Sequence, residues 1–256
     1  MDKMNILIDN GVDVESSLNI LGDIQTYNDV IMDFVDELRE KKIEIEKFID
    51  SMDLYDYSIT AHSIKSGAMY LGFEKLADIS LKHEIESKDN NEKFIKDEYK
   101  NLLTEINAVL EICSSYLSLI KTEPEILSLT DNISNKKVLI VDDSNVIINL
   151  IRNNIDSNVD CIGVNNGKSA IDIIEKDYEQ ISGIFLDLHM PSSNGFLVLD
   201  YLKDKKLFDK ILVFVETGSN DLFTIEKAYS YPIVDIINKP FTKEQIEKAI
   251  NQIFKI

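Results

Sequence analysis

The apolar residues of this 256-residue chain change their spacing near residue 136. Over residues 1–120 they recur at helical spacing among charged residues, and proline is absent. From residue 137 onward, five short apolar runs alternate with amphipathic stretches; the runs read KVLIVDD, DCIGV, GIFLDL, ILVFVE and IVDIIN. Buried strands that alternate with helices favour a parallel sheet covered on both faces. The pattern therefore predicts an antiparallel helical bundle followed by a (βα)5 doubly wound parallel sheet.

The two patterns are separated by the segment KTEPEILSLTDNISNK, residues 121–136. It contains Pro124 and many Ser, Thr and Asn residues, and its apolar residues have only a weak period, which is typical of a linker. A length of 256 residues is also enough for two ordinary domains. We therefore predict a helical bundle over 1–120, a linker over 121–136 and an α/β domain over 137–256.

The composition excludes several classes of protein. The chain has 46 acidic and 27 basic residues and a net charge of −19, whereas nucleic-acid binding needs basic surface. Its two cysteines, Cys113 and Cys161, lie far apart in the sequence and indicate neither a disulfide framework nor a zinc site, which fits a reducing cytoplasm. The N-terminus lacks the apolar run of a signal peptide, and no stretch approaches 18 apolar residues. We expect a cytoplasmic protein with no nucleic-acid partner and no membrane insertion.

Polar residues stand where the predicted strands end. Asp142 and Asp143 end the first strand, Asp187 the third, Thr217 the fourth and Lys239 the fifth. Ligands of open α/β sheets bind outside the carboxyl ends of the strands, so these side chains should meet at one edge. Three carboxylates repel one another unless a cation lies between them, and hard oxygen ligands suit Mg²⁺. A lysine and a threonine beside them would complement the oxygens of a phosphoryl group.

The segments VLIVDDSN, IFLDLHMPSSNG, VFVETGS and NKPF resemble, in order and spacing, the receiver domain of bacterial response regulators. The resemblance covers 137–256 and implies the flavodoxin-like form of the predicted sheet. It implies that Asp187 is the phosphoacceptor. It further implies that Asp143 ligates Mg²⁺ directly, that Asp142 assists, and that the backbone carbonyl of His189 completes the protein's share of the ligands.

The same resemblance implies that Thr217 and Lys239 contact the phosphoryl group. Any one of these polar residues could instead be a solvated turn or a helix cap, but four motifs in order argue against that interpretation. One position departs from the family. Three residues before the lysine, where the family often has Tyr or Phe, stands Ile236. The aromatic switch of the family is therefore not expected here.

The segment AHSIKSGAMYLG places His62, Lys65 and Ser66 on one face of a predicted helix. With Gly72, it is similar to the signature of the histidine-containing phosphotransfer (HPt) domain, and the resemblance covers about residues 10–118. It implies that His62 carries a phosphoryl group and that Lys65 screens its charge. A histidine with an ordinary pKa near 6.5 is largely neutral at pH 7, and a neutral imidazole nitrogen is a good nucleophile. Ser66 replaces a common glycine but is still small.

These inferences predict a two-component phosphorelay protein that carries phosphoryl groups on His62 and Asp187. Its expected partners are a sensor histidine kinase, another receiver domain, or both, and a downstream protein target. The sequence contains no Gly-rich ATP-binding motif, so it does not predict a histidine kinase. One alternative is an interaction module that does not use His62. Another is an aspartyl-phosphate phosphatase, but that class needs a second acid where this chain has His189.

Overall fold

The computed structural model describes residues 3–120, 136–155, 159–190, 194–218 and 222–254. The chain divides into two compact units, Met1–Ser128 and Leu129–Ile256. The division falls inside the predicted linker, most of which lies outside the described residues. The first unit is helical and the second holds a five-stranded sheet, which confirms the predicted fold class.

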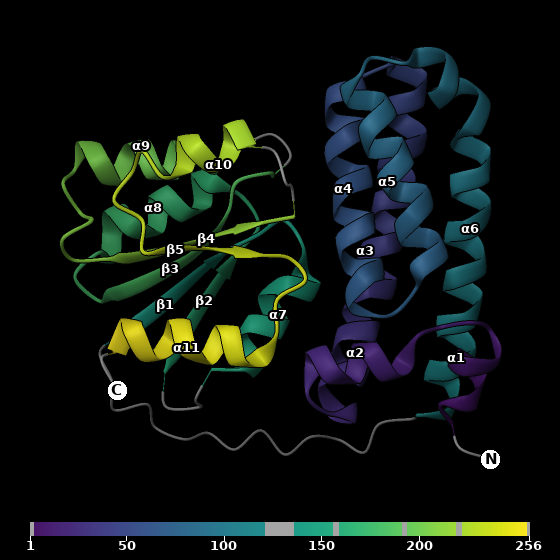
Figure 1. Cartoon of the computed structure of the whole chain (residues 1–256), viewed down its shortest axis with the longest axis horizontal. Helices are drawn as coiled ribbons and strands as arrows, with labels where there is room; N and C mark the ends of the chain where they lie inside the picture. The colour runs from purple at the N-terminus through teal and green to yellow at the C-terminus, as the bar shows by residue number, and fades with distance from the viewer. Residues whose placement is uncertain (1–2, 121–135, 156–158, 191–193, 219–221, 255–256) are drawn as a thin grey trace. The chain divides into compact units, whose positions relative to one another are not determined.

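The helical unit is built around long helices that lie side by side (Figure 1). Its elements are α1 (Asn5–Asp9), α2 (Val14–Leu21), α3 (Ile24–Ser51), α4 (Leu54–Tyr70), α5 (Glu74–Lys88) and α6 (Glu92–Leu119). Asp23, Asp53 and Asn91 precede α3, α4 and α6, and each side chain accepts a hydrogen bond from a backbone N–H of the first turn. These caps satisfy donors that a helix start leaves without a partner, and they fix where each helix begins.

Helix α4 lies in contact with α2, α3 and α5. Four apolar residues on and just after this helix are at most 1% exposed; they are Ala61, Ile64, Ala68 and Leu71. Gly72, with φ of +76°, turns the chain toward α5, and its carbonyl accepts a hydrogen bond from the Asp13 N–H at 3.0 Å. A side chain at this position would collide with the Asp13 backbone, so glycine is required there.

Among the described helices, α6 is long and apolar enough to be a membrane-span candidate by composition, with a mean hydropathy of 1.2 over 18 residues. The sequence had led us to expect no membrane span. In the structure α6 packs against α3 and α5 and buries Leu102, Ile106 and Val109. Apolar residues along one stripe are typical of a helix that packs in a bundle.

The second unit is a parallel sheet with strand order β2-β1-β3-β4-β5. The strands are β1 (Lys137–Val141), β2 (Asp160–Val164), β3 (Ile181–Asp187), β4 (Leu212–Thr217) and β5 (Asp235–Asn238). The helices are α7 (Asn145–Asn153), α8 (Gly167–Asp177), α9 (Phe196–Asp204), α10 (Leu222–Ala228) and α11 (Lys243–Phe254). Helices α7 and α11 cover one face of the sheet and α8, α9 and α10 the other (Figure 1). This order is that of the flavodoxin-like doubly wound fold.

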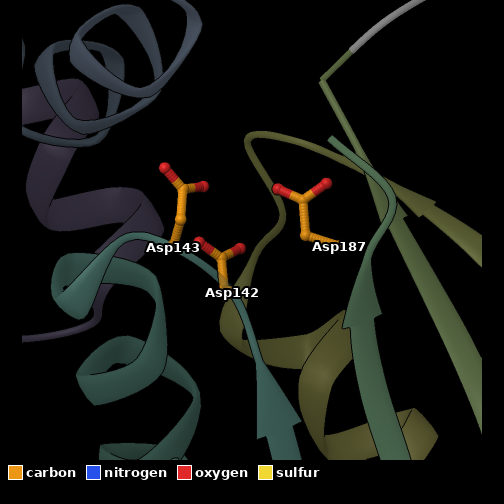
Figure 2. A group of neighbouring side chains, drawn as sticks. All are labelled: Asp142, Asp143 and Asp187. Carbon is orange, nitrogen blue, oxygen red and sulfur yellow. The ribbon is translucent and has the colours of Figure 1, made fainter. Parts of the chain in front are cut away.

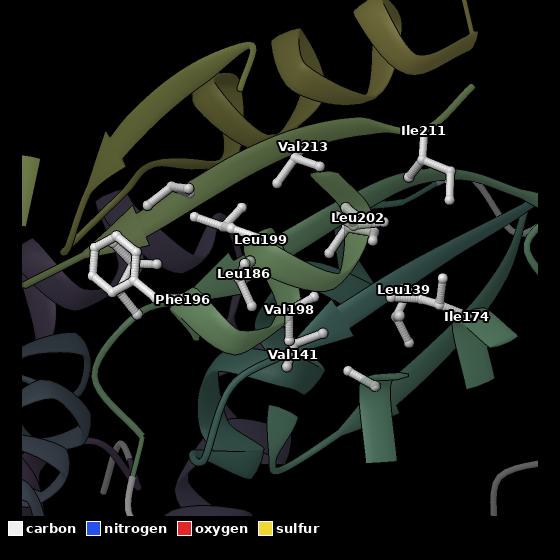
Figure 3. Packing of buried hydrophobic residues seen from close by; sticks show 14 of the residues in the cluster. Leu139, Val141, Ile174, Leu186, Phe196, Val198, Leu199, Leu202, Ile211 and Val213 are labelled. Atoms are coloured by element: carbon white, nitrogen blue, oxygen red, sulfur yellow. The ribbon is translucent and has the colours of Figure 1, made fainter. Parts of the chain in front are cut away.

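Apolar strand residues hold the helices on the sheet. On the face under α8 and α9, Leu139, Leu186 and Val213 belong to one buried cluster with Ile174 and Leu202 (Figure 3). Because all five strands are parallel, this packing brings their carboxyl ends to one edge. The last strand is shorter than its apolar run suggested, and begins at Asp235.

Candidate functional site

Three carboxylates meet at the carboxyl edge of the sheet (Figure 2). Asp142 and Asp143 follow β1, and Asp187 is the last residue of β3. One oxygen of each lies within 4.8 Å of the others. Asp142 and Asp187 are each 1% exposed, and Asp143 is half-buried. Such a group of hard oxygen donors fits a divalent cation such as Mg²⁺, which would offset the repulsion between the carboxylates.

The Lys239 ammonium lies against this group from the end of β5. It donates a hydrogen bond to Oδ2 of Asp187 at 2.6 Å and another to Oδ2 of Asp142. The side chain is 4% exposed. Burial alone would lower the pKa of Lys239, but the surrounding carboxylates raise it well above its usual value. Lys239 is therefore a fixed positive charge beside Asp187.

Backbone groups orient the carboxylates. The N–H of His189 donates to Oδ1 of Asp187 at 2.8 Å, and the N–H of Ser144 donates to Oδ1 of Asp142 at 2.8 Å. His189 therefore belongs to the site through its backbone, and the ligand role of its carbonyl stays a prediction. Thr217 ends β4 beside the site, 2% exposed, and its carbonyl accepts a hydrogen bond from the Lys239 N–H at 2.8 Å.

A fourth carboxyl group, Glu216, was not predicted as a site residue. It is 0% exposed, and its Oε2 lies 3.8 Å from the Lys239 Nζ. Burial raises its pKa to about 7, with Lys239 opposing the shift and Asp187 adding to it. One feature of the sequence could have identified it: an acidic residue stands in the mostly apolar segment LVFVET, where a buried strand is expected to be apolar.

Ile236, the departure from the receiver pattern, lies on β5. It is half-buried and packs against the cluster under α8, α9 and α10. An aliphatic side chain therefore contributes to the core at the position where the family often has an aromatic ring.

His62 lies on α4 and contacts a residue that sequence reasoning missed. Its Nδ1 is 2.8 Å from Oε1 of Glu84, on α5. Lys65 places its Nζ 2.7 Å from Oε2 of Glu84, and Lys88 places its Nζ 2.7 Å from Oε1. Two cations and an imidazole therefore surround one carboxylate, whose side chain is 5% exposed.

This cluster fixes the orientation of the imidazole ring. Burial alone would raise the pKa of Glu84, but the hydrogen bond and charge of His62 and the charge of Lys65 hold it well below its usual value. When the His62 ring is neutral, the Glu84 carboxylate is in place to accept its Nδ1 proton, which leaves the lone pair on Nε2. His62 is 3% exposed, so a phosphoryl donor has to gain access to Nε2.

His83, the residue before Glu84, has a structural role. It is 1% exposed, and its Nδ1 lies 2.7 Å from the hydroxyl of Tyr57. Burial lowers its pKa to about 4, so it is neutral at physiological pH. Its burial and its contact with Tyr57 are those of a structural residue.

Comparisons with known proteins agree with the geometry at the sheet edge. Residues 138–251 match the family model of the response regulator receiver domain. The chain is 28% identical over 122 residues to the alkaline phosphatase synthesis transcriptional regulatory protein PhoP of Bacillus subtilis, covering 47% of this chain and 49% of the relative. It is also 28% identical over 125 residues to the transcriptional regulatory protein CiaR of Streptococcus pneumoniae, covering 46% and 51%.

The chain thus spans about half the length of the curated relatives it matches. Among solved structures, it is similar to the chemotaxis response regulator CheY4 of Vibrio cholerae, with 20% identity and a TM-score of 0.42, covering 46% of this chain and 98% of that one.

Proposed function

Because residues 138–251 form a receiver domain related to two-component response regulators, we propose that this chain is a phosphorelay protein with two phosphoryl acceptors. One is Asp187 in the receiver domain, and the other is His62 in the helical unit. The observation that supports the proposal most strongly is the buried Asp187 carboxylate, which contacts Lys239 and lies beside the acidic pair Asp142 and Asp143.

At Asp187, the reaction is attack by a carboxylate oxygen on the phosphorus of a donor, with departure of the donor's leaving group. Lys239 is in place to offset charge on the phosphoryl oxygens, and the Thr217 hydroxyl is the expected donor to one of them. Asp142, Asp143 and Asp187, with the His189 carbonyl, would hold Mg²⁺. When bound, the metal would neutralise part of the negative charge of the phosphoryl group during its transfer.

At His62, the nucleophile is Nε2, because Glu84 holds the proton on Nδ1. The imidazole attacks the phosphorus of a phosphoaspartate on another receiver or of a kinase phosphohistidine, and the donor side chain leaves. Lys65 supplies positive charge beside the product. This chemistry needs neither a metal nor a base from the helical unit. The helical unit then acts as an HPt domain.

The partners implied are proteins that present or accept a phosphoryl group. They are a sensor histidine kinase, another receiver domain, or both, with a downstream protein target that responds to the phosphorylated state. We propose that the chain acts in the cytoplasm, which its two widely separated cysteines fit.

The test is phosphorylation of the whole chain by acetyl phosphate with Mg²⁺, followed by intact mass. The carboxylate of Asp187 takes the phosphoryl group and acetate leaves. We expect Asp187→Asn to abolish the mass increase, while Asp204→Asn, an exposed acid on α9, leaves it unchanged. Undiminished labelling of Asp187→Asn would refute the assignment.

A further inference from the structure

Glu216 stands in a position where a carboxyl group is costly. It lies near the end of β4, between Val215 and Thr217, and it pairs in register with Asp187 on β3 and Ile237 on β5. It is 0% exposed, and neither of its side-chain oxygens makes a hydrogen bond with the described residues. Burying a carboxyl without such bonds is unfavourable unless a charge compensates for the loss of water.

The compensating charge belongs to the phosphorylation site. The Lys239 Nζ lies 3.8 Å from Glu216 Oε2, and it also bonds to Asp142 and Asp187. One ammonium is thus divided among three buried carboxyl groups. Glu216 lies outside the group of acids that could share a metal ion, which comprises Asp142, Asp143 and Asp187 in the part of the chain that the structure describes.

We propose that Glu216 is a positioning residue of the receiver site, which shares the Lys239 ammonium with Asp187 and so weakens the hold of the site on a phosphoryl group. The inference rests on the proposed phosphorylation of Asp187. A phosphoryl group that binds at Asp187 competes with Glu216 for the same ammonium, and it also meets the negative charge of Glu216 in a buried site.

Removing the charge of Glu216 should change the affinities for Mg²⁺ and for a phosphoryl group in opposite directions. A negative charge near the site attracts a cation and repels an anion. Replacing Glu216 with glutamine keeps the shape of the side chain and removes its charge. We therefore expect Glu216→Gln to bind Mg²⁺ more weakly and the phosphoryl mimic beryllofluoride more tightly. Loss of folding or a loosened site would weaken both.

The experiment measures both affinities on the whole chain. Mg²⁺ is titrated alone, and beryllofluoride is titrated at saturating Mg²⁺ with bound fluorine followed by ¹⁹F NMR. For Glu216→Gln we expect about tenfold tighter beryllofluoride binding and a severalfold weaker Mg²⁺ affinity. Glu216→Asp keeps the charge and should lie closer to the wild type than the glutamine variant.

The matched control is Glu226→Gln, which removes one exposed negative charge from α10 of the same domain. It should change neither affinity by more than about twofold, because exposed charges are screened. Unchanged beryllofluoride binding in Glu216→Gln, or weaker binding of both ions, would overturn the inference. Failure of the wild-type chain to bind beryllofluoride would instead count against the proposed function itself.

Discussion

The two proposed phosphoryl acceptors lie in charge environments of opposite balance. At the sheet edge, Lys239 faces Asp142, Asp187 and Glu216, so carboxyl groups outnumber the cation. In the helical unit, the single carboxylate of Glu84 faces Lys65, Lys88 and the His62 ring. A site with excess negative charge needs a divalent cation before an anionic group can bind, whereas the cluster at His62 needs none. A buried lysine–carboxylate contact therefore occurs at both proposed acceptors, in an excess of negative charge at Asp187 and in an excess of positive charge at His62.

The largest expected effect comes from removing a metal ligand at the acidic site. Asp143→Ala should lower the affinity for Mg²⁺ by about 100-fold, while Thr217→Ala, which removes only a phosphoryl contact, should change it by less than about threefold. Titration of Mg²⁺ into the whole chain measures both. Equal losses in the two variants would show that the acidic cluster is not the metal site.

The corresponding change at the other site is Glu84→Gln. We expect about 10-fold slower phosphorylation of His62, because glutamine can present its amide N–H₂ to Nδ1 and favour the tautomer whose Nε2 carries the proton. The measurement uses phosphoramidate as donor with a chelator present. Asp78→Asn, an exposed acid on α5, is the control and should react as the wild type does. If Glu84→Gln reacts at the wild-type rate, Glu84 does not prepare His62 for phosphorylation.

The Glu84 carboxylate should also make the stability of the helical unit depend on pH. The folded pKa of Glu84 is lowered, so its stabilisation is full above its unfolded pKa of about 4.3 and is lost as the pH falls through the lower folded pKa. Glu84→Gln should cost about 3 kcal/mol at neutral pH, and this difference should shrink below about pH 4. Hydrogen exchange of α4 and α5 peptides, with β1 peptides as internal reference, reports it. A difference that is constant with pH would contradict the paired carboxylate.

The smallest expected effect is at Ile236. Since this residue is half-buried on β5 and packs against the apolar cluster of the sheet, Ile236→Tyr should leave the rate of Asp187 phosphorylation within about threefold of the wild type. Acetyl phosphate labelling followed by intact mass checks this. A large loss would show that the site depends on an aliphatic side chain at this position.

Much of the receiver half could be predicted from the sequence, because parallel strands bring their carboxyl ends to one edge. This rule alone places Asp142, Asp187 and Lys239 together. Glu216 was not predicted as a site residue, and only the packing shows that it is buried and that Lys239 lies near its carboxyl group.

The helical half was harder to predict. Helical periodicity places His62 and Lys65 on one face of α4, but it does not give the rotation of one helix against another. Glu84 lies 22 residues from His62 and reaches it only through the packing of α5 on α4. The identity of the partner of His62 therefore required the structure.

The central claim, that one chain carries two acceptors of which one needs a metal, has a direct test. The whole chain is treated with phosphoramidate, first with a chelator and then with Mg²⁺, and intact mass and acid lability are recorded. We predict one acid-labile phosphoryl group in the chelator, absent from His62→Gln, and a second with Mg²⁺, absent from Asp187→Asn. Equal labelling of the wild type and His62→Gln in the chelator, or of the wild type and Asp187→Asn with Mg²⁺, would contradict the account.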